Sequence, residues 1–156
     1  MTEISKLTKD LIDISNTPDA DDFVDNFEDK LSEFLELNTP NIIGSLLPFF
    51  DDNSEYDELM FSIIHTIEVF EDEIYVKQII NNLRDFCLES PKWASIVHMR
   101  ILNSDSTLNS YIANLKIATQ DNLDVLELLL KSMAKQGEDI KEKVAPLLKE
   151  VRNVSC

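Results

Sequence analysis

Residues 56–87 read YDELMFSIIHTIEVFEDEIYVKQIINNLRDFC, and this stretch decides the fold. Its apolar side chains recur at steps of three and four residues, the spacing that places them on one face of an α-helix. An acidic run at 71–73 divides them into two stripes: Tyr56, Leu59, Met60, Ile63, Ile64, Ile67 and Phe70, then Ile74, Ile79, Ile80, Leu83, Phe86 and Cys87. The pattern predicts two consecutive helices, with Ser54 as the cap of the first.

The same spacing continues toward the N-terminus. It predicts helices near residues 4–14 and 23–35. A short third helix is expected to begin at Pro40, with Thr39 as its cap, and to end near Pro48, because these residue types favour the first turn, the cap and the end of a helix.

Toward the C-terminus, Ser90 followed by Pro91 is a typical cap and first-turn pair, and it predicts the start of a sixth helix. We expect Pro146 to kink or split the last helix, because proline lacks the backbone N–H that a helix interior needs. The remaining apolar spacing places the last three helices near residues 106–118, 121–135 and 139–152.

The chain contains only two glycines and five prolines among 156 residues. Such sparse turn residues argue against an all-β fold, which needs frequent turns. We therefore predict an all-α fold with about eight helices, arranged as a compact bundle or as a short stack of helical hairpins. Its length fits a single all-helical domain over residues 1–156.

The chain shows no sign of secretion or of membrane insertion. Its first residues, MTEISKLTKDLIDIS, lack the apolar core of a signal peptide, and no stretch approaches the ~20 apolar residues of a membrane span. Two cysteines, Cys87 and Cys156, form neither a disulfide framework nor a metal-binding motif. We expect a cytoplasmic protein.

The net charge of −16 is unevenly distributed. Residues 1–75 carry 20 Asp and Glu against three Lys, a net charge of −17, whereas residues 76–156 carry 10 acids against 11 Lys and Arg, a net charge of +1. Dense negative charge repels nucleic acid and anionic lipid and accelerates encounter with basic proteins. The charge therefore excludes nucleic acid and membrane as partners and predicts a basic protein partner.

Acidic side chains cluster at the two ends of the helix expected after Ser54, where nine acids stand between residues 51 and 73 without one Lys or Arg. We predict that these clusters and two neighbouring tyrosines bind the partner: Asp51, Asp52, Glu55, Tyr56, Asp57, Glu58, Glu71, Asp72, Glu73 and Tyr75. A second set of acids alternates with the apolar stripe at 23–35, so we interpret it as an ordinary solvated helix face: Asp19, Asp21, Asp22, Asp25, Glu28, Asp29, Glu33 and Glu36.

Catalytic chemistry has few candidate residues. His65 and His98 are the only histidines, and no second carboxylate–histidine pair accompanies His65 and Glu68 to form a di-metal site. Cys87 is more typical of a small core residue than of a nucleophile. We therefore predict no enzyme activity, no metal and no cofactor. Among the aromatic residues, we expect Trp93 in the core, and Phe49 and Phe50 either in the core or as exposed anchors.

Two segments, YDELMFSIIHTIE at 56–68 and SPKWASIVHMRILNSDSTLNSY at 90–111, resemble the all-helical immunity protein family thirty of bacterial polymorphic-toxin and contact-dependent growth inhibition systems. The resemblance continues through EDEIYVKQIINNLRDF at 71–86. It implies a protein that binds and neutralises the toxic domain of a secreted or cell-surface effector. Many such toxins are nucleases with basic grooves, so it also implies that an acidic inhibitor blocks the active site or substrate groove. We expect a monomer that forms a 1:1 complex with its cognate toxin domain.

Three other functions remain as alternatives. A helical-repeat scaffold or adaptor would bind a basic peptide or regulator, and would bind several partners weakly. A nucleic-acid mimic would carry acids spaced like phosphates along one face. A helical enzyme would depend on Cys87, His65 or His98, and alanine at these positions would abolish its function.

Overall fold

The computed structural model describes residues 2–155, and all regular secondary structure in that range is helical. It comprises ten α-helices and two 3₁₀ helices, which confirms the predicted all-α class. The contacts group the chain into two compact units, unit 1 over residues 1–70 and unit 2 over residues 71–156. The single domain over 1–156 stays a prediction. No helix within 2–155 is long and apolar enough to span a membrane.

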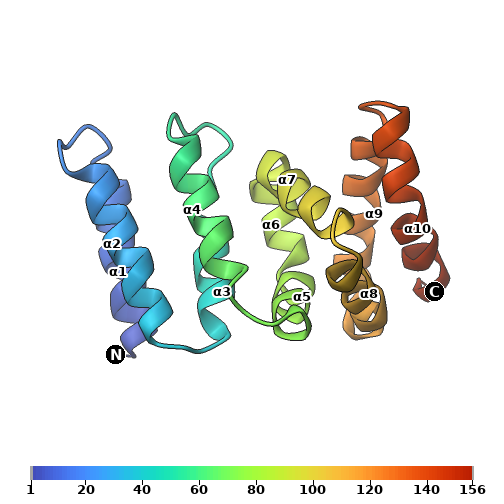
Figure 1. Cartoon of the computed structure of the whole chain (residues 1–156), viewed down its shortest axis with the longest axis horizontal. Coiled ribbons are helices and arrows are strands. Elements are labelled where there is room, and N and C mark those ends of the chain that lie inside the picture. The colour runs from blue at the N-terminus through green and yellow to red at the C-terminus, as the bar shows by residue number, and fades with distance from the viewer. Residues whose placement is uncertain (1, 156) are drawn as a thin grey trace. The chain divides into compact units, whose positions relative to one another are not determined.

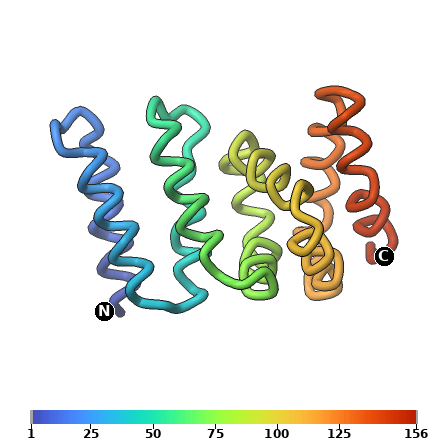
Figure 2. The backbone as a smooth tube through the Cα atoms, viewed as in Figure 1, coloured from blue at the N-terminus to red at the C-terminus, as the bar shows by residue number. Residues whose placement is uncertain are grey.

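Unit 1 is built from antiparallel helices (Figures 1 and 2). Its elements are α1 (Glu3–Ser15), α2 (Phe23–Glu36), α3 (Asn41–Leu46), the 3₁₀ helix η1 (Leu47–Phe49) and α4 (Asp57–Ile67). Helix α2 contacts α1 and α4, and α3 contacts the same two helices. Because each helix reverses the direction of the one before it, the α1–α2 and η1–α4 connections lie at the same end of the unit (Figure 1).

The apolar stripes bury the facing sides of these helices. Phe27 and Phe34 of α2 and Ile63 and Ile64 of α4 are almost completely buried. Helix α2 ends two residues before Asn38, whose φ of 48° lies in the left-handed region that asparagine tolerates better than most residues. The chain can therefore turn sharply from α2 toward α3.

Two predicted caps are wrong in detail. Helix α4 begins at Asp57, and the Ser54 hydroxyl accepts the Tyr56 backbone N–H at 3.1 Å. Ser54 thus stabilises the turn before the helix and not the helix itself, as serine often does in loops. Helix α3 has Pro40 at its N-cap, where no side chain caps it, instead of Thr39.

Unit 2 has a less sequential arrangement, in which α5 contacts α8 and α6 contacts α9 (Figure 1). Its elements are α5 (Asp72–Asn81), α6 (Leu83–Glu89), α7 (Pro91–Leu102), α8 (Asp105–Asn114), the 3₁₀ helix η2 (Leu115–Ile117), α9 (Gln120–Ala134) and α10 (Glu138–Val154). Trp93 exposes 1% of its surface, which confirms it as a core residue. The core of unit 2 therefore joins helices that are distant in the sequence.

Where one helix was expected over residues 74–87, the chain forms α5 and α6, because Asn82 interrupts it. The Asn82 side-chain amide donates to the Gln78 carbonyl at 2.7 Å, a local bond of the kind that competes with helical hydrogen bonds. The Arg84 backbone N–H donates to the Asn122 side chain of α9 at 3.0 Å. An inter-helix contact thus takes the place of continued helical bonding.

Helix α10 runs without a break through Pro146, so the predicted split is wrong. Pro146 lies on the exposed side, and Val144, Leu147 and Val151 are buried. The burial of this face holds the helix together despite the one hydrogen bond that proline cannot donate.

A fully buried histidine lies in the core of unit 2. His98 Nδ1 is 2.7 Å from the Ala94 carbonyl, and Nε2 is 2.9 Å from the Tyr111 hydroxyl. Because a carbonyl oxygen can only accept, Nδ1 carries the proton, and Nε2 of the neutral ring accepts from Tyr111. Burial lowers the pKa of His98 from its ordinary value of 6.5 to about 4. The neutral ring thus satisfies both of its nitrogens within the core, and burial disfavours the charged form.

We expect the stability of the protein to depend on His98 in acid. Its pKa is lower in the folded than in the unfolded chain, so its contribution is complete above pH 6.5 and is lost as the pH falls toward 4. The free energy of unfolding should decrease by roughly 3 kcal/mol over this range, relative to the variant His98→Gln. Urea unfolding at several pH values measures the difference, and parallel pH curves for the two proteins would contradict the prediction.

Candidate functional site

One end of unit 1 concentrates acidic side chains from two connections that are distant in the sequence. We call eight residues the acidic end: Asp19, Asp21 and Asp22 from the α1–α2 connection, with Asp51, Asp52, Glu55, Asp57 and Glu58 from the η1–α4 connection and the first turn of α4. The Tyr56 hydroxyl donates to the Pro18 carbonyl at 2.9 Å and ties the two connections together. The fold thus joins acids that lie more than 30 positions apart in the sequence.

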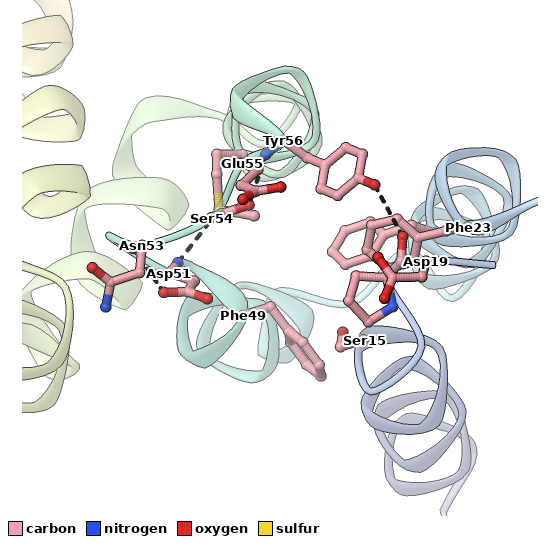
Figure 3. Close-up of a pocket in the computed structure, with 12 residues that line it drawn as sticks. Ser15, Asp19, Phe23, Phe49, Asp51, Asn53, Ser54, Glu55 and Tyr56 are labelled. Carbon is pink, nitrogen blue, oxygen red and sulfur yellow. Dashed lines mark hydrogen bonds between the residues drawn. The ribbon is translucent and has the colours of Figure 1, made fainter. Parts of the chain in front are cut away.

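A pocket of about 380 Å³ opens between these two connections (Figure 3). Three carboxylates line it, from Asp19, Asp51 and Glu55. Aromatic and apolar side chains form much of the remaining wall, and small polar residues complete it: Phe23, Phe27, Phe49, Tyr56, Met60, Pro18, Ser15, Asn53 and Ser54. The pocket is therefore both acidic and aromatic, and its lining contains no Lys or Arg.

The aromatic wall is held in place by the fold. The rings of Tyr56 and Phe23 lie 4.9 Å apart at 58°, and the hydroxyl bond to Pro18 fixes the far end of the tyrosine. Phe23 is buried, whereas Tyr56 and Phe49 are half-buried. Phe50 lies in the core. Of the two neighbouring phenylalanines, Phe49 is thus the one that faces the pocket.

Several acids of the acidic end have a structural explanation. Asp22 precedes α2, and Asp57 and Glu58 occupy the first turn of α4, where the partial positive charge of a helix N-terminus favours carboxylates. The Asp51 carboxylate accepts the Asn53 backbone N–H at 2.9 Å and shapes the loop. Local structure therefore accounts for part of the negative charge at this end.

Asp19 and Glu55 have no such role. Within residues 2–155, no ion pair engages either carboxylate. Unit 1 holds 17 Asp and Glu against three Lys, a net charge of −14. One of those lysines, Lys30, lies 2.7 Å from Glu33 and 3.4 Å from Asp10, and the hydrogen bond to Glu33 is the main cause that raises its pKa. Unit 1 therefore supplies few positive charges to balance the carboxylates of the pocket.

The second predicted cluster, at the start of α5, serves the packing of unit 2. Asp72 accepts hydrogen bonds from Ser106 and Thr107 of α8, each at 2.8 Å. Glu73 accepts from Asn114 of the same helix at 3.0 Å and lies 3.2 Å from Lys77, and these bonds lower its pKa.

The other two residues of this cluster differ from each other. Tyr75 exposes only 3% of its surface, which leaves a partner almost nothing to touch. Glu71 precedes α5 as its N-cap residue and is exposed. Of the four residues predicted here, only Glu71 remains a fully exposed acid without a described tie to α8.

Asp19, Asp21 and Asp22 were interpreted from the sequence as part of a solvated helix face, yet they stand beside the predicted cluster at 51–58. The antiparallel rule contained the missing signal, since alternate connections of such a helical array lie at the same end. The choice of Phe49 over Phe50 as a pocket residue had no comparable signal in the sequence.

We expect the bonds between α5 and α8 to contribute measurably to stability. Asp72→Ala removes the carboxylate that accepts hydrogen bonds from Ser106 and Thr107, and it should cost about 1–3 kcal/mol. Glu71→Ala removes a neighbouring exposed acid and should change the free energy of unfolding by less than about 0.5 kcal/mol. Chemical unfolding of both variants provides the measurement. If both variants lose the same free energy of unfolding, Asp72 acts only through its charge and not through its bonds to α8.

The residues considered for catalysis do not form a reactive site. Burial raises the pKa of the Cys87 thiol to about 12, so the thiol stays protonated at neutral pH. His98 uses both ring nitrogens within the core and is not placed to activate it. His65 is exposed on α4, and within residues 2–155 no group of three or more His, Cys, Asp and Glu could hold a metal ion.

The family model described as Immunity protein 30 matches residues 16–111, a range that includes the whole acidic end and all but one residue of the pocket lining. No curated protein and no solved structure matches the chain. The family match confirms the resemblance drawn from residues 56–111 and the prediction that the chain is not an enzyme. Because the match covers more than half of the 156 residues, the chain belongs to the Immunity protein 30 family.

Proposed function

We propose that this chain binds and neutralises a cognate toxin domain in the cytoplasm of the cell that produces it. The family supports toxin neutralisation. The rest is supported by the acidic end, where two connections and the first turn of α4 collect eight carboxylates, three of which line a pocket. Such a surface complements a basic protein, so the toxin is a basic domain of the nuclease type, delivered by a contact-dependent or other polymorphic-toxin system.

Electrostatic attraction supports rapid capture of such a toxin. A surface with one sign of charge steers an oppositely charged partner and can raise the association rate by orders of magnitude over a neutral encounter. Unit 1 carries a net charge of −14, whereas unit 2 has 13 acids against 11 basic residues, a net charge of −2. The attraction therefore acts mainly on unit 1.

The acidic end also supports inhibition by occlusion. The groove of a nuclease binds phosphates with cationic side chains, so carboxylates at the tip of a rigid helical unit compete for the same cations. Asp51, Asp52, Glu55, Tyr56, Asp57 and Glu58 form one part of the proposed contact surface, and Asp19, Asp21 and Asp22 form the other. Asp72, Glu73 and Tyr75 are left out because they bind or pack within unit 2. One monomer blocks one toxin domain.

The test begins with the tagged chain as bait in lysate from its native host. A captured basic protein is identified by mass and then expressed in a heterologous bacterium with and without the chain. Growth arrest by that protein, relieved by co-expression of the chain, is the expected result. A captured set of weak partners lost in moderate salt, with no growth effect, would contradict the proposal and favour a scaffold.

We expect charge reversal at the acidic end to abolish protection. The triple variant Asp21→Lys, Asp52→Lys and Glu58→Lys alters acids outside the pocket lining and should slow toxin association at low salt by at least about tenfold, because steering is lost. The dissociation rate should change less. Surface plasmon resonance at several salt concentrations and the growth assay provide the measurements.

A matched control carries Glu3→Lys, Asp29→Lys and Glu36→Lys, three exposed acids of unit 1 outside the acidic end. It changes the net charge by the same amount and should retain protection and most of the association rate. If both triple variants lose protection and association rate to the same extent, the net charge of the chain and not the acidic end governs binding.

A further inference from the structure

We propose that the pocket of the acidic end receives an arginine side chain of the toxin, with the guanidinium among the carboxylates of Asp19, Asp51 and Glu55 and against the ring of Tyr56. This inference deepens the proposed function, on which it rests for the partner that supplies the arginine. The arginine would add one defined contact to the general attraction between the acidic end and a basic toxin.

The pocket has the size and wall chemistry for a long cationic side chain. Its volume of about 380 Å³ falls within the range of small-ligand sites. The half-buried ring of Phe49 suits the aliphatic part of the arginine, and the carboxylates suit its charged end. Figure 3 shows Glu55, Asp51 and Asp19 at separate positions around the opening, with the Tyr56 and Phe49 rings between them.

Charge complementarity identifies the occupant as a cation. The charged side chains of the lining are the carboxylates of Asp19, Asp51 and Glu55, and no Lys or Arg lines the pocket. Asp19 and Glu55 form no ion pair within residues 2–155. A cation bound among these carboxylates is attracted by each of them.

The pocket favours a guanidinium over a metal ion. No group of three or more His, Cys, Asp and Glu within the described residues could hold a metal ion. A guanidinium is wider, is planar, and directs five N–H donors outward, so it can reach carboxylates on different sides of a pocket. Three carboxylates in one lining therefore suit a group that carries several hydrogen-bond donors.

The aromatic wall distinguishes arginine from lysine. Arginine stacks on aromatic faces and is more weakly hydrated than an ammonium group. Tyr56 is held by its bond to Pro18 at 2.9 Å and by its contact with Phe23 at 4.9 Å between ring centroids. A ring fixed in advance loses little conformational freedom on binding, which favours affinity.

The direct test is a titration of the full chain with N-acetyl-L-arginine amide, followed by NMR of the aromatic and backbone resonances. The uncharged analogue N-acetyl-L-citrulline amide has the same shape and serves as the control, and N-acetyl-L-lysine amide tests the preference for the guanidinium. We expect saturable shifts of the Tyr56, Phe23 and Phe49 resonances with the arginine probe alone. Equal shifts with all three probes, or shifts spread evenly over the acids of unit 1, would overturn the proposal.

Two variants test whether the pocket residues are responsible for arginine binding. Glu55→Gln keeps the shape of the side chain and removes its charge, and it should weaken arginine binding at least about threefold, as should Tyr56→Leu. Glu36→Gln, an exposed acid at the end of α2, makes the same change in charge outside the pocket lining and should leave binding unchanged. A loss with Glu36→Gln that equals the loss with Glu55→Gln would overturn the pocket assignment.

The captured toxin separates this inference from the proposed function. If the chain protects against the toxin, Glu55→Gln should raise the dissociation rate of the complex by about tenfold while Glu36→Gln leaves it unchanged. Protection with no effect of Glu55→Gln would overturn the arginine pocket and leave the proposed function in place. Arginine binding without any growth protection would support the pocket and overturn the proposed function.

Discussion

Burial of the facing apolar sides of α2 and α4 is the constraint on which the candidate site depends. These helices can bury their phenylalanine and isoleucine stripes only if the chain reverses between successive helices. The reversal places the connection before α2 at the same end as the connection before α4 (Figure 1). The acids of both connections meet there because the core requires it.

Local structure explains only part of the concentration of negative charge at this end. Two helix N-termini favour nearby carboxylates, and Asp51 forms a loop hydrogen bond. Asp19 and Glu55 gain nothing comparable from the described chain. A folded protein tolerates a few unfavourable contacts at a functional surface when the rest of its core is well packed. The buried stripes of unit 1 provide such a core.

Acidic residues have different roles in the two units. In unit 2, Asp72 and Glu73 are bound to hydroxyl and amide groups of α8 and stabilise the packing of α5. In unit 1, three acids of the acidic end line a pocket. The same residue type thus stabilises one helix pair and forms a surface for a partner elsewhere, and the neighbouring donors determine which role it has.

The sequence by itself determined the helical class, most helix positions, the burial of Trp93 and the family, because these depend on local spacing and residue type. It also predicted the cluster at 51–58, since those acids are adjacent in the chain. It missed the break at Asn82, where the Arg84 backbone N–H donates to Asn122 of a distant helix. It predicted a kink or a split at Pro146, and the structure shows no split there. Only the tertiary structure decided that Asp19 joins Asp51 and Glu55 at one pocket and that Asp72, Glu73 and Tyr75 belong to the packing of unit 2. These outcomes depend on which side chains face one another across helices, and the order of residues along one chain does not specify those distances.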